Sequence, residues 1–164
     1  MTEIVIGVAV GAAVAIIGQL IAFLFDLIKQ KENERRKSKA VIKLLLEELA
    51  AHQTLYEHLL PWVDESIAKG GEQYTGYSYQ PPRTEAYEKV FLPNWYVLPD
   101  EVVTAVAEYY TTIEPLNIMS GSSGTPAPIP ITQVRGCVRN AQLKAGETRP
   151  ILERHLSSKR PRAD

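Results

Sequence analysis

The sequence predicts an all-α protein in which a single N-terminal transmembrane helix continues into a small cytosolic bundle of antiparallel helices. Three observations carry this prediction. The 22 residues from Ile4 to Phe25 hold no charged side chain. Later segments repeat apolar residues at spacings of three and four, which is the period of an amphipathic helix. No part of the chain offers a competing strand pattern.

The apolar run from Ile4 to Phe25 has the length of a membrane span. As a helix it extends about 33 Å, close to the hydrocarbon core of about 30 Å. A cleaved signal peptide fits less well, because the start of the chain is acidic (Glu3) and the run exceeds the usual length of about 7–15 residues. Basic residues follow the run, and basic flanks stay in the cytoplasm. We therefore expect a bacterial inner (plasma) membrane protein with its N-terminus outside and its C-terminus cytoplasmic.

One side of this span carries small residues. Gly7 and Gly11 form a GxxxG pair, and Ala15 and Gly18 extend it. Small residues let helices approach closely in lipid, and the amide of Gln19, deep in the apolar run, favours a hydrogen-bond partner on another helix. We predict a helix contact within the membrane. The alternative is that Gln19 bonds to its own backbone, and a homo-oligomer is left open.

Charge is strongly segregated behind an overall net charge of −1. Residues 29–43 hold seven bases and two acids, residues 44–117 hold three bases and twelve acids, and residues 133–164 hold eight bases and three acids. The juxtamembrane bases are expected near lipid headgroups: Lys29, Lys31, Arg35, Arg36, Lys37 and Lys39. The basic C-terminal region either lies against the acidic middle or turns toward an anionic leaflet.

The soluble part carries three sets of amphipathic positions. The first set follows the membrane segment: Val41, Leu45, Leu49, His52, Tyr56 and Leu59. The second begins after Pro99, which suits a first helical position: Val102, Val106, Tyr109 and Ile113. The third is split into two short stripes: Val134, Cys137, Val138 and Ala141, then Ile151, Leu152 and Leu156.

Proline and glycine are expected to interrupt these helices. Pro61 is predicted to kink or end the first helix, Pro115 to end the second, and Gly146 with Pro150 to break the third into two pieces. The predicted organisation is a transmembrane anchor (1–28), a basic juxtamembrane helix (29–43), an acidic helical bundle (44–117), a flexible Gly/Ser/Pro linker (118–131), a basic C-terminal helical region (132–157) and a disordered tail (158–164).

We expect no catalytic, metal or cofactor site. Glu48 and His52 are four residues apart and able to share a metal, but a di-iron bundle needs further paired carboxylates and histidines. We therefore interpret His52 as a polar residue in a helix interface. Cys137 lies on an apolar stripe, and we interpret it as a core cysteine. Its neighbours Arg135 and Arg139 would lower its pKa, which leaves a reactive thiol open.

Loop aromatics are the candidate partner-binding residues: Tyr74, Tyr77, Tyr79, Trp95 and Tyr96. Such side chains bury a large area and keep a polar atom available, although they also suit closing the bundle's own end. The acidic body argues against nucleic acid. The sequence thus predicts a non-enzymatic single-pass membrane protein, a tether or accessory subunit whose partners are the lipid bilayer and a membrane or cytosolic protein. The runner-up is a self-assembling membrane effector that permeabilises or gates the membrane as a homo-oligomer.

Overall fold

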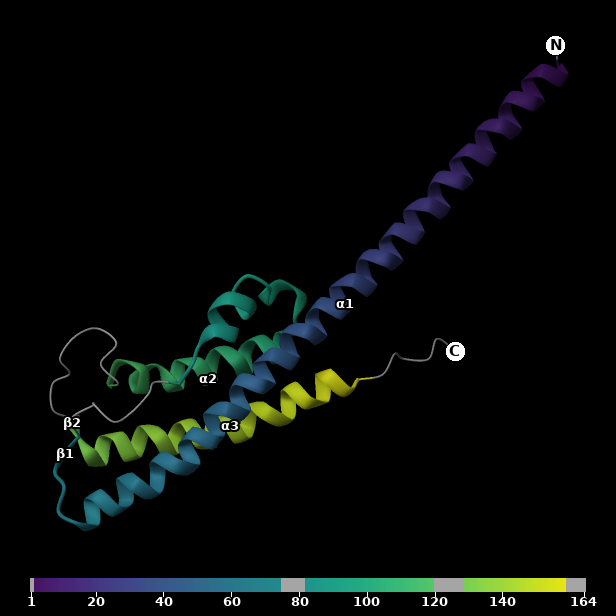
Figure 1. Ribbon diagram of the computed structural model, residues 1–164. Coiled ribbons are helices and arrows are strands. Elements are labelled where there is room, and N and C mark those ends of the chain that lie inside the picture. The colour runs from purple at the N-terminus through teal and green to yellow at the C-terminus, as the bar shows by residue number, and fades with distance from the viewer. Residues whose placement is uncertain (1, 75–81, 120–128, 159–164) are drawn as a thin grey trace. The chain divides into compact units, whose positions relative to one another are not determined.

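The computed structural model describes residues 2–74, 82–119 and 129–158, and places their side chains except those of residues 2–18, 73, 74 and 119. The elements in chain order are α1 (Thr2–Ala68), β1 (Gln73–Tyr74), the π-helical turn η1 (Tyr87–Phe91), the 3₁₀ turn η2 (Trp95–Val97), α2 (Asp100–Met119), β2 (Ile129–Pro130) and α3 (Ile131–Ser157) (Figure 1). The all-α prediction is confirmed. The chain divides into two units, Met1–Lys37 and Ser38–Asp164, and each is described by itself.

In the unit from Ser38 onward, α3 runs antiparallel to α1. Lys39 near the start of this part of α1 donates from Nζ to the carbonyl oxygen of Ser158, 3.3 Å away. Asp64 near the end of α1 pairs with Arg135 in the first turns of α3, with Oδ1 and Nε 2.5 Å apart. The N-terminal part of this stretch of α1 therefore contacts the end of α3, and its C-terminal part contacts the start of α3.

Helix α3 also runs antiparallel to α2, and its bases meet the acids of α2. Arg154 and His155 both lie 2.9 Å from the carboxylate of Glu101, and Lys144 Nζ lies 2.6 Å from Glu108. The hydrogen bond with His155 lowers the pKa of Glu101. The sequence left two positions open for the basic C-terminal region, against the acidic middle of the chain or toward an anionic leaflet. The described part of this region lies against the acidic middle.

Because α3 is antiparallel to both neighbours, α1 and α2 are parallel to each other. The prediction of antiparallel helices is thus correct for α3 and wrong for the pair α1 and α2. A parallel pair needs a connection that returns along the bundle. Residues 82–98 belong to this connection and include η1 and η2; we call them the return segment. It lies beside α2 in Figure 1.

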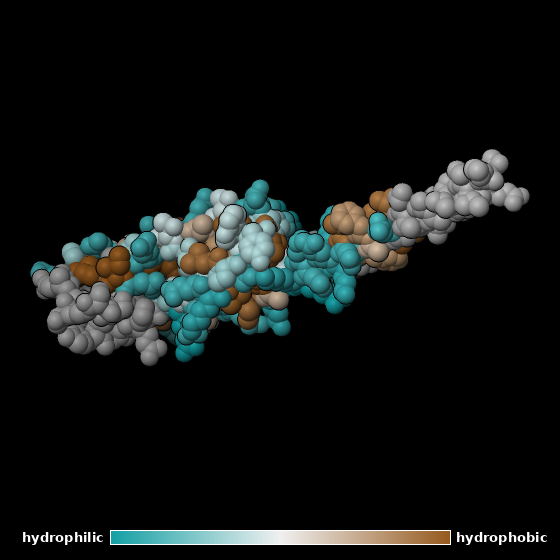
Figure 2. Space-filling view, turned by 90° about the horizontal axis from the view of Figure 1, so that it is seen from above, coloured by the Kyte–Doolittle hydropathy of each residue, from teal (hydrophilic) through white to brown (hydrophobic). Residues whose placement is uncertain are grey.

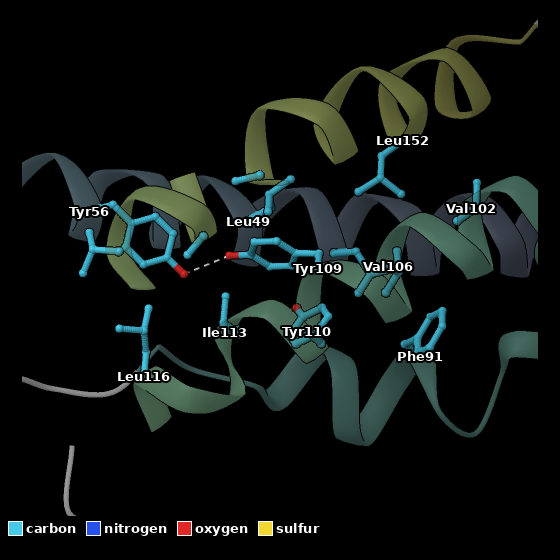
Figure 3. Packing of buried hydrophobic residues seen from close by; sticks show 14 of the residues in the cluster. Leu49, Tyr56, Phe91, Val102, Val106, Tyr109, Tyr110, Ile113, Leu116 and Leu152 are labelled. Atoms are coloured by element: carbon cyan, nitrogen blue, oxygen red, sulfur yellow. Dashed lines mark hydrogen bonds between the residues drawn. The ribbon is translucent and has the colours of Figure 1, made fainter. Parts of the chain in front are cut away.

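The hydrophobic core draws on all three helices and on the return segment (Figure 3). The predicted stripe of α1 is buried from Val41 to Tyr56, and Val63 extends it. The predicted face of α2 is buried too, and Leu116 extends it. These side chains supply the apolar burial that holds the unit together.

Neither α1 nor α2 ends at its proline, because Pro61 and Pro115 both lie inside continuous helices. The predicted end at Pro115 is therefore wrong, and of the two predictions for Pro61, a kink or an end, the end is wrong. A proline in a helix interior costs about 3 kcal/mol. Buried core residues that follow each proline in the same helix offset this cost: Val63 is 0% exposed and Leu116 is 1% exposed. Each such side chain contributes about 1.5–3 kcal/mol when it is fully buried.

Helix α3 is likewise one helix, and Gly146 and Pro150 do not break it. Its buried residues repeat at alternating spacings of three and four: Ile131, Val134, Val138, Ala141, Ala145, Thr148 and Leu152. The same spacing continues across Gly146 and Pro150, so the buried residues before and after the predicted break lie on one side of the helix. Each turn therefore buries an apolar side chain only if the helix continues. The small residues in the middle of the row allow α3 to lie close to α2.

The end of α1 is set by a glycine. Gly70 has a positive φ of 78°, a conformation that strongly favours glycine. Its N–H donates to Ile67 and the N–H of Gly71 donates to Ser66, so the last carbonyls of the helix are satisfied. Beyond it, the two-residue strands β1 and β2 pair antiparallel, with Gln73 opposite Pro130. The sequence pattern did not predict this pairing.

Candidate functional site

The most polar part of the interior lies where His52 of α1 meets α2 and the return segment. His52 is 2% exposed. Its Nε2 lies 2.5 Å from the carbonyl oxygen of Arg83, and its Nδ1 lies 2.7 Å from the hydroxyl of Tyr109. The hydroxyls of Tyr56 and Tyr109 are 3.2 Å apart, and Figure 3 draws this bond as a dashed line. The imidazole therefore bridges three segments of the chain.

The hydrogen bonds of His52 fix which ring nitrogen carries the proton. A carbonyl oxygen only accepts, so Nε2 holds the hydrogen and donates to Arg83. Burial lowers the pKa of His52, and the bond with Arg83 and the charge of Glu48 oppose this only in part. The ring is consequently neutral at pH 7, and Nδ1 accepts from Tyr109, whose oxygen accepts from Tyr56.

A second set of bonds surrounds Glu48, one turn before His52 on α1. The hydroxyl of Tyr110 donates to Oε1, and the backbone N–H of Ala86 donates to Oε2 at 2.7 Å. Burial, reinforced by the bond with Glu48, raises the pKa of Tyr110. Burial also raises the pKa of Tyr56 to about 12. These tyrosines therefore stay protonated and act as donors.

Aromatic rings hold the return segment next to these polar groups. The ring of Tyr87 stacks on Tyr110 with centroids 4.1 Å apart, and on Phe91 with centroids 5.2 Å apart. Stacked rings add to the free energy of burial. Polar bonds and ring contacts thus attach η1 to α1 and α2. We call the set Glu48, His52, Tyr56, Tyr109 and Tyr110, with the Arg83 carbonyl, the His52 network.

The interpretation of His52 as a residue in a helix interface is confirmed. In the part of the chain that the structure describes, no three His, Cys, Asp or Glu residues come together as a metal site. Sequence reasoning missed the network itself. A signal was present, because Glu48, His52 and Tyr56 are spaced by four residues and Tyr109 lies on the buried face of α2.

Cys137 packs beside the core and is half-buried. Burial raises the pKa of its thiol, whereas an activated thiol needs a lowered pKa. Arg135, which the sequence placed beside it as a possible activator, forms its ion pair with Asp64. This supports the core-cysteine interpretation.

Two of the predicted partner-binding residues form an exposed patch on the return segment. Trp95 is 57% exposed and Tyr96 is 62% exposed, and Leu92 beside them is 49% exposed. We call these three residues the aromatic corner. They do not close the end of the bundle, because their side chains face outward. The remaining candidates fall outside the described residues or, for the first, the described side chains: Tyr74, Tyr77 and Tyr79.

The predicted membrane-contact residues lie mostly beyond the described side chains, namely Gly7, Gly11, Ala15 and Gly18. Gln19 is described and exposed. Among the residues for which side chains are placed, no helix is long and apolar enough to cross a membrane. The structure therefore gives the transmembrane prediction no direct support.

The juxtamembrane bases divide between the two units. Lys29 and Lys31 are exposed, and Arg36 pairs with Glu32 at 3.3 Å. Lys39 belongs to the other unit, where it donates to the carbonyl oxygen of Ser158, the residue that follows α3. Arg35 and Lys37 lie in the first unit with the rest of the cluster.

Comparison with protein-family models, with curated proteins and with solved structures finds no match for this chain.

Proposed function

We propose that this protein is a non-enzymatic single-pass membrane protein that acts as a tether or accessory subunit. Its location would be a bacterial inner membrane, with the N-terminus outside and the C-terminus in the cytoplasm. The observation that carries the proposal is a group of seven large apolar side chains, each 44–68% exposed: Leu20, Ile21, Phe23, Leu24, Phe25, Leu27 and Ile28. Figure 2 shows brown hydrophobic side chains in this part of the chain. Exposed apolar surface of this extent marks contact with lipid or protein.

The arrangement of these side chains supports a helix that faces lipid on one side and another helix on the other. Gln19, Ala22 and Asp26 are spaced by three and four, so they share one side of α1. The seven large apolar residues cover the rest. By sequence spacing alone, Gly11 and Ala15 continue the small and polar side. Such a side suits close approach and hydrogen bonding between membrane helices.

The unit from Ser38 onward supports a binding role rather than a catalytic one. The polar groups of the His52 network are bonded to one another, which suits a structural interior. The aromatic corner is the surface we assign to a membrane or cytosolic protein partner, because exposed Trp and Tyr side chains carry much of the energy of protein interfaces.

Membrane insertion is tested by alkaline carbonate extraction of cell membranes. We expect the wild-type chain to stay in the membrane pellet. The substitutions Val14→Lys and Ile17→Lys together should release it, because each charge near the span centre costs about 2.5–3.5 kcal/mol. Leu143→Lys is the matched control, since Leu143 is 68% exposed on α3. A wild-type chain that appears in the supernatant contradicts the proposal.

The tether role is tested by the native mass of the chain purified in mild detergent from its own host, with co-purifying chains identified by mass spectrometry. A stoichiometric second subunit that is lost in Trp95→Ala/Tyr96→Ala supports the proposal. Trp62→Ala is the control, because Trp62 is 42% exposed on α1. A homo-oligomer alone, dissociated by Gly11→Leu, would instead establish the self-assembling effector.

A further inference from the structure

A basic stretch of α1 begins directly after the exposed apolar side chains described above. Ile28, the last of them, is 64% exposed, and Lys29 comes next. In Figure 2, teal hydrophilic side chains adjoin the brown ones in this part of the chain. Residues 29–37 hold five bases and two acids, a net charge of +3, on about 12 Å of helix. We call these five bases the basic collar: Lys29, Lys31, Arg35, Arg36 and Lys37.

The basic collar surrounds the helix. Each residue of an α-helix is turned by about 100° from the one before it. Lys29 and Arg36 are seven residues apart and share one side. Lys31 and Arg35 are four residues apart and lie on nearly the opposite side, and Lys37 falls between the two pairs. Positive charge therefore faces outward in every direction around this part of α1.

A ring of positive charge fits a partner that encloses the helix. A single partner helix or a nucleic-acid duplex contacts one side of α1, whereas a bilayer contacts every side of a helix that leaves it. We propose that the basic collar binds the phosphate groups of anionic phospholipids and selects these lipids from the surrounding membrane. Guanidinium groups bind phosphate through paired hydrogen bonds, and ammonium groups bind it as point charges. This inference rests on the membrane insertion proposed above.

The two acids of this segment leave the basic collar accessible. Glu34 accepts a hydrogen bond from the side chain of Gln30 at 3.1 Å. Glu32 pairs with Arg36 at 3.3 Å, but the Arg36 side chain is still 77% exposed. Exposed ion pairs at this spacing contribute little to stability, so a lipid phosphate competes well with the carboxylate. Every base of the collar except Arg35 is exposed.

The basic collar also lies at the depth of the lipid headgroups. Lys29 and Lys31 follow Ile28 by about 1.5 and 4.5 Å along the helix axis. The headgroup layer on each face of a bilayer is about 5–8 Å thick, so both bases fall within it. Side chains of an α-helix tilt toward its N-terminus, which here is the direction of the apolar side chains. The long side chains of residues 35–37 therefore extend back toward the lipid.

The test uses the full-length protein in phosphatidylcholine vesicles, with spin-labelled phosphatidylglycerol or spin-labelled phosphatidylcholine as the probe. Electron paramagnetic resonance separates lipids held at the protein surface from free lipids, and so compares the association constants of the two probes. We expect phosphatidylglycerol to associate about fivefold more strongly, the effect of one base for each headgroup. In about 1 M NaCl this preference should disappear, because the screening length falls to about 3 Å.

Three sets of variants connect the preference to the basic collar. Replacing all five collar bases with Gln should remove it, whereas Arg35→Lys/Arg36→Lys keeps the charge and should keep the preference. Because the charge surrounds the helix, Lys29→Gln/Arg36→Gln and Lys31→Gln/Arg35→Gln should each reduce it by a similar factor. The matched control removes five exposed bases of the unit from Ser38 onward and should leave the preference unchanged: Lys43→Gln, Lys69→Gln, Lys89→Gln, Arg139→Gln and Arg149→Gln.

Several results would overturn the basic collar. One is a preference that survives in the five-base collar variant, and another is a loss confined to one of the two pairs, which would show a one-sided site. If sodium phosphate removes the preference and sodium chloride of equal ionic strength does not, the bases form a site for soluble anions instead. A wild-type chain that enters the vesicles and shows no lipid preference overturns the collar alone. A chain that does not enter the vesicles overturns membrane insertion as well.

Discussion

Removing the hydroxyl of Tyr109 tests the directed hydrogen bonds of the His52 network most sharply. The substitution Tyr109→Phe keeps the ring in a site that is 1% exposed. It removes the bonds to His52 at 2.7 Å and to Tyr56 at 3.2 Å. The ring nitrogen Nδ1 loses its donor, and the hydroxyl of Tyr56, which is 0% exposed, loses its acceptor.

The matched variant Tyr56→Phe removes only the last bond of the chain. Tyr109 then still donates to His52, so the expected loss is about 0.5–1.5 kcal/mol. Tyr109→Phe leaves two buried groups unsatisfied, and a cost of about 1–3 kcal/mol for each predicts a total of about 2–6 kcal/mol. In the double variant, removing the Tyr56 hydroxyl also removes one unsatisfied donor. The two effects should therefore fall short of additivity by about 1 kcal/mol.

The measurement is urea unfolding of the full-length variants in mild detergent at pH 7.5, followed by circular dichroism. The free energy of unfolding should fall in the order wild type, Tyr56→Phe, Tyr109→Phe. A Tyr56→Phe variant as unstable as Tyr109→Phe, or strict additivity in the double variant, would refute the proposed direction of the bonds.

Three further predictions concern α3. Gly146→Ala should raise the free energy of unfolding by about 0.5–1 kcal/mol, because an added Cβ meets nothing within 4 Å; urea unfolding that shows a decrease contradicts this. Ala145→Leu should lower it by about 1–3 kcal/mol, since this position is 0% exposed against the core, and an unchanged midpoint would show that the site has spare room. Cys137 should react with iodoacetamide at pH 7.5 more slowly in the folded chain than in urea, because burial raises its pKa; mass spectrometry measures the rates, and faster labelling of the folded chain would indicate an activated thiol.

The helical class and most buried positions could be read from the sequence. Val41, Leu45 and Leu49 on α1 recur at helical spacing, and the structure buries them to 3% exposure or less. The end of α1 at Gly70 was also predictable, because glycine there takes a positive φ that other residues rarely adopt. Apolar spacing and the position of a glycine are local features of the sequence. Local features are enough to predict where a helix forms and where it ends, because both depend on the backbone conformation of nearby residues.

The continuity of the helices was not predictable in the same way. A proline signals a break because its local cost is visible in the sequence, whereas the burial that offsets it is not. Val63 beyond Pro61, and Leu152 beyond Pro150, are buried by side chains from distant parts of the chain. Only the packed bundle decides whether burial exceeds the local cost.

The candidate site depended even more on tertiary structure. The sequence shows Glu48 and His52 one turn apart, but not that a return segment brings the carbonyl of Arg83 to the ring. Nor does it show that α1 and α2 run parallel, which places Tyr109 opposite His52. The sequence by itself determined where helices form and which sides are apolar, because these follow from spacing along one segment. The tertiary structure alone decided which buried polar groups meet, because each of their bonds joins residues far apart in the chain.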